Sequence, residues 1–180
     1  MKPYNDITTM FLIEPCCTQK HWPELRKLLG DGGTMLWEGY GDLSIAELLP
    51  VILARYTEVE MMLVAPSIPN RAAEVLSYWL RRQMVTVDGK RKVPVLARLT
   101  IVADLSEKRS PLASTWLKEN PYGERLVLKN VQQNDTALIL PDIALHGPFN
   151  LTYGKHFTAT ATKNAKTIVE LRNTFANLCP

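Results

Sequence analysis

The sequence predicts an α/β domain, an α/β/α sandwich in which helices cover both faces of a mixed, mostly parallel sheet. Apolar segments of strand length alternate with amphipathic helical segments along the chain. The 180 residues can bury one sizeable core, and 46% hydrophobic with 22% charged residues is an ordinary globular composition. We therefore expect one domain over residues 1–180, with residues 1–33 as an N-terminal extension whose packing the pattern leaves open.

The first half of the chain alternates between the two kinds of segment. Short apolar segments predict strands at residues 7–14, 33–41 and 59–67. Apolar residues at helical spacing predict helices at residues 21–30, 42–56 and 69–83. In the second of these helices, Asp42 or Ser44 can cap the N-terminus, and Pro50 would kink the helix or restart it.

The second half continues the alternation and adds a hairpin. Asp88-Gly89 is a turn signal between two short segments, and a buried strand follows at 95–104. A helix begins near Ser110 and Pro111. Further strands are expected at residues 125–131, 136–142, 143–147 and 155–162, before an amphipathic closing helix at 164–177.

Composition narrows the class of protein. The longest apolar runs are about ten residues, too short to cross a bilayer. Glu14 and Pro15 interrupt the apolar patch near the N-terminus, which therefore resembles a signal peptide only poorly. We expect a cytoplasmic protein. The three cysteines, Cys16, Cys17 and Cys179, form no disulfide framework and are expected to be free thiols. No metal-ligand spacing or cofactor motif appears, so we expect neither.

A cluster of positive charge indicates an anionic partner. Arg81 and Arg82 end one predicted helix, and Lys90, Arg91 and Lys92 follow the Asp88-Gly89 turn. Five cations within twelve residues can bind a phosphate backbone, so nucleic acid is the ligand class expected here. The alternative is a solvated helix end and hairpin tip, where cations are favoured without any ligand.

One stretch near the C-terminus resembles a known family. Residues 134–154 read NDTALILPDIALHGPFNLTYG, an apolar strand ending at Asp142 and a second short run leading to Gly147 and Asn150. With the closing helix, this resembles the end of a phospholipase D-like (HKD) domain, whose half-motif is H-x-K-x4-D followed by G-[SG]-x-N. The resemblance implies phosphodiester chemistry with a histidine nucleophile. A chain with one motif would then act as a two-fold homodimer.

The motif is degenerate in this chain. With Asp142 as the motif aspartate, the histidine position reads Asp135 and the lysine position reads Ala137. Asn150 matches the motif asparagine, while Pro148 replaces the usual Ser or Gly. A carboxylate at the histidine position repels a phosphate, and alanine donates no hydrogen bond to it.

Three hypotheses follow from this pattern. The first is a non-catalytic phospholipase D-like module for binding or assembly, with nucleic acid or another phosphate-bearing ligand. The second is a phosphodiesterase or nuclease in a homodimeric site, in which a displaced His146 acts with Asp142 and Asn150. The third is an unrelated α/β domain whose likeness to the motif is accidental.

Overall fold

The computed structural model describes residues 34–39, 58–81, 86–87, 90–91, 95–147 and 157–178, together with Leu49, Leu53, Tyr56 and Leu151. The predicted extension at 1–33, with its segments 7–14 and 21–30, lies outside these residues. The predicted helix at 42–56 lies mostly outside them. None of the described helices is long and apolar enough to span a bilayer.

The described strands and helices follow the predicted alternation. The main sheet contains β1 (Thr34–Gly39), β2 (Glu58–Val64), β5 (Val95–Ala103), β6 (Leu126–Asn130), β7 (Ala137–Ile139), β8 (Ala144–His146) and β9 (Phe157–Thr162). The helices are α4 (Asn70–Arg81), α5 (Pro111–Glu119), α6 (Ala165–Ala176) and the short 3-10 turn η1 (Gly123–Arg125). A separate hairpin consists of β3 (Thr86–Val87) and β4 (Lys90–Arg91), as the Asp88-Gly89 turn predicted.

The sheet is mixed, as predicted, but the expectation that it is mostly parallel is wrong. Its order is β1-β9-β8-β7-β2-β5-β6. Among the described pairings only β2 with β5 and β5 with β6 are parallel. Parallel neighbours need a crossover, which α4 and α5 supply. The turn between β7 and β8 is too short for a crossover, so these two strands are antiparallel, and β8 pairs with β9 in the same way.

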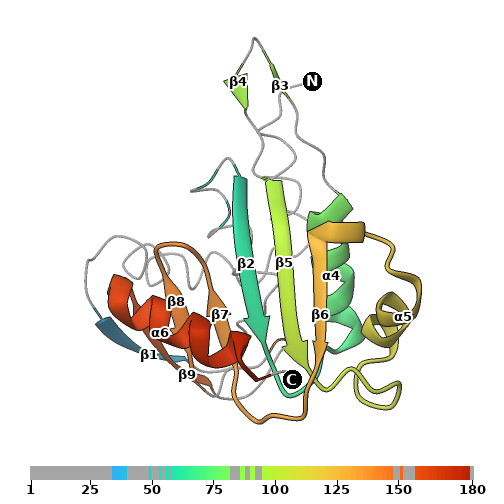
Figure 1. Cartoon of the computed structure of the whole chain (residues 1–180). Coiled ribbons are helices and arrows are strands. Elements are labelled where there is room, and N and C mark those ends of the chain that lie inside the picture. Colours follow the sequence, from blue (N-terminus) through green and yellow to red (C-terminus); the bar gives the residue numbers. More distant parts are fainter. Residues whose placement is uncertain are drawn as a thin grey trace.

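Helices cover both faces of the sheet (Figure 1). On one face, Leu76 and Trp79 of α4 and Trp116 of α5 join the larger apolar cluster. On the other face, Ile168 and Phe175 of α6 pack in a smaller cluster with residues of β2, β5, β7 and β8. The predicted three layers therefore exist, and the sheet residues alternate between the two clusters, as the two-residue period of strands requires.

The topology gives the sheet two functionally distinct edges. We call the carboxyl edge the one at which β2, β5 and β6 end. There β7 begins and β8 ends, because Val64 pairs with Ala137 and Ala137 pairs with His146. The opposite, amino edge holds the turn between β7 and β8. Figure 1 shows the β3–β4 hairpin beyond the amino ends of β2 and β5.

Both ends of α6 are fixed by side chains. At its N-terminus, the Asn164 side chain accepts a hydrogen bond from the Thr167 N–H at 3.1 Å. At its C-terminus, the Lys129 ammonium of β6 donates to the Ala176 carbonyl at 2.6 Å. A cation at this position also interacts favourably with the negative end of the helix dipole. Lys129 therefore ties α6 to β6, the last strand of the sheet.

We predict that K129M lowers the free energy of unfolding by about 1 kcal/mol, since it removes a charged hydrogen bond at a helix C-terminus while keeping most of the side-chain volume. Urea unfolding followed by circular dichroism measures this. The matched control is K166M on the same helix. Lys166 is exposed and forms a weak ion pair, with 3.9 Å between its Nζ and Oε1 of Glu170. Equal losses in the two variants would contradict the role assigned to Lys129.

Candidate functional site

Asp135 and Ala137, which the sequence pattern assigns to the histidine and lysine positions of the motif, lie at the carboxyl edge of the sheet. Asp135 is exposed in the loop that precedes β7, and Ala137 is the first residue of β7. The Ala137 side chain is 0% exposed and belongs to the apolar cluster beneath α6. The lysine position of the motif therefore points into packed apolar side chains and offers no polar group to a ligand.

His146 lies next to these positions. It is the last residue of β8 and pairs with Ala137 across the hairpin. Its ring is half-buried, with its centroid 6.1 Å from that of Phe175 in α6. The following Gly147 has φ of 142°, a conformation that glycine adopts most readily, and its N–H donates to the Thr136 carbonyl at 3.0 Å. His146 is thus held at the carboxyl edge.

Asp142 lies at the other end of the same hairpin. It is exposed in the turn between β7 and β8 and accepts a hydrogen bond from the Tyr56 hydroxyl. At about 3.3 Å per strand residue, the four residue steps from Asp142 to His146 span about 13 Å. The structure therefore does not bring these two predicted site residues together. The third, Asn150, lies outside the described residues, as does Pro148.

The predicted basic cluster lies towards the amino edge. Helix α4 returns the chain from the carboxyl edge to the amino edge and ends at the exposed Arg81. Lys90 and Arg91 form β4 of the hairpin that precedes β5. Arg82 and Lys92 lie outside the described residues. The described basic positions thus lie towards the amino edge of the sheet, whereas His146 lies at the carboxyl edge.

A buried carboxylate that the sequence did not single out lies at the carboxyl edge. Asp104 follows β5, is only 6% exposed, and accepts a hydrogen bond from the Ser106 N–H at 3.0 Å. The Arg109 guanidinium is 3.6 Å from its other oxygen. Hydrogen bonds from the hydroxyl and N–H of Ser106, and then the charge of Arg109, hold the pKa of Asp104 below its ordinary value, although burial acts in the opposite direction.

This carboxylate belongs to a network that fixes the loops of the carboxyl edge. The Ser110 hydroxyl donates to the Asp104 carbonyl at 2.6 Å and accepts from the Ile68 N–H at 2.8 Å. The Asn130 side chain accepts from the Leu105 N–H at 2.9 Å. These hydrogen bonds therefore link the loops after β2 and β5 and the end of β6 to one another.

One polar side chain at this edge has no hydrogen-bond partner among the residues that the structure describes. Gln133 is in the loop between β6 and β7, and both polar atoms of its side chain are buried without a hydrogen bond. An unbonded buried amide costs about 1–3 kcal/mol, which a polar ligand would recover. Within the described part of the chain, no group of three or more His, Cys, Asp or Glu side chains is placed to hold a metal ion.

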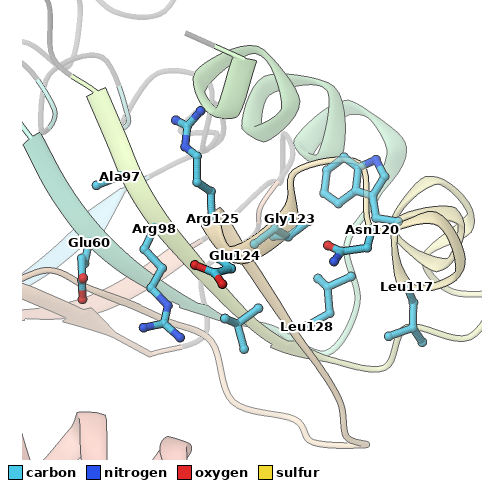
Figure 2. A pocket seen from close by; sticks show the side chains of 12 residues that line it. Glu60, Ala97, Arg98, Leu117, Asn120, Gly123, Glu124, Arg125 and Leu128 are labelled. Carbon is cyan, nitrogen blue, oxygen red and sulfur yellow. The ribbon is translucent and has the colours of Figure 1, made fainter. Parts of the chain in front are cut away.

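A second surface feature is an open hollow of about 870 Å³ along β6 (Figure 2). Leu117 and Asn120 at the end of α5 line one side of it. Glu60 of β2 and Arg98 of β5, which pair with each other, line the other side. The Arg125 guanidinium, at the amino end of β6, donates to the Leu96 carbonyl at 2.7 Å. The hollow follows the outer edge of the sheet, whereas His146 lies on β8, several strands away.

Comparison with known proteins finds similarity in structure alone. No protein-family model and no curated protein sequence matches the chain. NucT from Helicobacter pylori superposes with a TM-score of 0.50 at 13% identity, over 80% of this chain and 96% of NucT. Nuc from Salmonella typhimurium, a phospholipase D family member, gives 0.45 at 15%, over 81% and 93%.

A further similar structure is TrmBL2, an archaeal chromatin protein with a novel mode of DNA binding. It superposes with a TM-score of 0.47 at 13% identity, over 96% of this chain. The match spans 63% of the TrmBL2 chain, less than two thirds of it. At such low identities the similarity concerns the fold. The predicted α/β fold with a mixed sheet is confirmed, and NucT shares this fold.

We predict that D104N has a lower urea midpoint of unfolding than the native chain at pH 7. The difference between the two midpoints should become smaller at low pH. The pKa of Asp104 is lower in the folded chain. Its carboxylate therefore stabilises the fold above the unfolded pKa of about 3.9, and this contribution is lost as the pH falls through the folded value. D135N, at an exposed aspartate, should leave the midpoint nearly unchanged. An effect of D104N as large at pH 3 as at pH 7 would contradict the assignment.

Proposed function

We propose that this protein is a phospholipase D-like module that has lost catalysis and serves binding or assembly as a homodimer, with nucleic acid or another phosphate-bearing ligand. One observation carries the proposal. The motif lysine position, Ala137, is fully buried beneath α6, and the motif histidine position is the exposed carboxylate of Asp135.

The chemistry of phosphodiester cleavage explains why this observation is decisive. The family mechanism needs a neutral nucleophile at phosphorus and cationic donors for the non-bridging oxygens. Asp135 brings a negative charge to the approaching phosphate, and Ala137 brings no donor. A lysine at position 137 would have to bury its ammonium group in an apolar layer, at a cost of several kcal/mol. The packing under α6 is therefore suited to alanine.

The charge distribution supports a phosphate backbone as the ligand. Arg81 ends α4 towards the amino edge, and Lys90 and Arg91 belong to the hairpin beyond this edge, away from the motif positions (Figure 1). Contacts between cations and phosphates position a protein on nucleic acid without any catalytic centre. Binding through this region would thus persist in a protein whose motif positions are inactive.

The second candidate function is a phosphodiesterase or nuclease that uses His146. It is favoured by the pairing of His146 with Ala137, which places an imidazole at the edge where the motif residues begin. The contact with Phe175 packs one side of this ring against α6. Asp142 is the carboxylate that the motif supplies, and it lies at the opposite edge of the sheet.

We predict no turnover of bis(p-nitrophenyl) phosphate or of plasmid DNA above a protein-free blank, and no difference between the native chain and H146A. Both proteins should be assayed from pH 5 to 9, with circular dichroism to show that each is folded. Hydrolysis by the native chain that H146A abolishes would establish the second candidate function instead.

We predict that the double variant K90A/R91A binds a fluorescent DNA duplex more weakly than the native chain. Each phosphate contact contributes about 0.9 to the slope of log K against log salt, so the slope should fall by up to about 2. Fluorescence anisotropy from 50 to 300 mM salt measures it. The control K108A/K118A removes the same charge from exposed lysines elsewhere. Equal weakening in both variants would indicate net charge alone and contradict a hairpin contact.

A further inference from the structure

The outer edge of β6 carries backbone groups that face away from the sheet. Within the described residues, β6 pairs with β5 alone. The Val131 N–H donates to the Ala103 carbonyl at 2.9 Å, so Val131 faces β5, and so do the residues two and four before it. Because the direction alternates along a strand, the N–H and C=O groups of Leu126, Leu128 and Asn130 point outwards.

Within the described residues, β6 carries neither a proline nor a bulge, two features that prevent strand pairing. Exposed edges are commonly protected by lysines, prolines or bulges. The strand reads LVLKN, and its one charged side chain, Lys129, is bound to the Ala176 carbonyl of α6. Val127 and Leu128 are half-buried, and Leu117 beside them is 46% exposed. The edge therefore combines outward backbone groups with accessible apolar side chains.

The hollow along β6 has the shape that an added strand requires. Leu117 and Leu128 line it on the α5 side, and Arg98 lines it on the face that carries α6 (Figure 2). An extended strand beside β6 would send alternate side chains to these two sides. An added strand would therefore occupy both sides of the hollow.

We propose that the occupant is a second copy of this chain, whose β6 pairs antiparallel with the first about a two-fold axis at Leu128. In this register Leu128 faces the partner's Leu128, and Leu126 faces the partner's Asn130. Each of these residues directs its N–H and C=O outwards, so every facing pair exchanges two hydrogen bonds, about six in all. The strand is thus complementary to itself.

Charge complementarity also favours a second copy. The same register places Val127 opposite the partner's Lys129. The bond from Lys129 to Ala176 holds the carboxyl end of α6 above this face of β6. The partner's α6 would therefore direct its negative end towards the face on which Arg98 lies exposed beside its cross-strand neighbour Glu60, where the Arg98 guanidinium can reach it. The two-fold axis creates this contact twice.

This dimer differs from the one that the phospholipase D resemblance implies. In an antiparallel pair, the carboxyl edges of the two copies point in opposite directions. Asp135 and His146 of one copy then remain far from their counterparts in the other. The inference goes beyond the proposed function, since it assigns the surface of assembly and does not depend on the ligand.

The first test is the mass in solution, measured by size-exclusion chromatography with light scattering. The native chain should run at twice 20.3 kDa. L128K should run as a folded monomer, because two ammonium groups would meet at the axis. The control V169K, at an apolar side chain of α6 that is 55% exposed, should remain a dimer. A dimer that persists in folded L128K, or a monomeric native chain, overturns the proposal.

The second test keeps the proposal falsifiable if L128K does not fold. Cysteine at position 128 is introduced in a background in which Cys16, Cys17 and Cys179 are serine. Facing Cα atoms in a bonded antiparallel pair are about 5.5 Å apart, within disulfide range. Mild oxidation should link L128C into dimers and leave V169C unlinked. Failure of L128C to link, or equal linking of V169C, overturns the pairing, whether or not the protein binds DNA.

Discussion

The arrangement of this molecule depends on strand β2, which pairs in parallel with β5 on one side and antiparallel with β7 on the other. The parallel side requires crossovers, and these place α4 and α5 over one face. The antiparallel side needs no crossover and continues as a β7–β8 hairpin. Because Val64 pairs with Ala137, the motif positions begin where β2 ends. The position of β2 therefore determines both the layers and the location of Asp135 and Ala137.

The burial of Ala137 follows from the same pairing. Successive strand residues face opposite sides, so Ala137 and Ile139 turn towards α6 while Leu138 turns to the larger cluster. Phe175 of α6 then packs in the same small cluster as Ala137 and touches the ring of His146. A long cationic side chain at position 137 would displace this packing. The small side chain at position 137 and the close packing of α6 therefore depend on each other.

Local patterns predicted local structure well. The helix at 70–81 and the hairpin at Asp88-Gly89 were evident from spacing and turn chemistry, because neighbouring residues determine both. The strand pairings were not evident from the sequence, because parallel and antiparallel strands can have the same apolar pattern. The strand expected at 136–142 ends at Ile139, so Asp142 lies in the turn and is separated from His146. The contacts of Asp104 with Arg109 and of Tyr56 with Asp142 form only when the chain folds. In the sequence, Asp104 is recognisable only as a carboxylate that follows a buried strand.

Basic residues and the polar residues of the carboxyl edge lie at opposite edges of the sheet. The proposed pairing of two β6 strands would bring the two kinds of edge next to each other. Arg81 and the β3–β4 hairpin lie towards the amino edge, whereas Gln133 and His146 lie towards the carboxyl edge. A single chain presents these groups on opposite sides. An antiparallel pair would set the amino edge of one copy beside the carboxyl edge of the other, so that a long anionic ligand could reach cations of one copy and the polar edge of its partner. In such a pair, Asp135 and His146 of one copy would remain far from the same residues of the other.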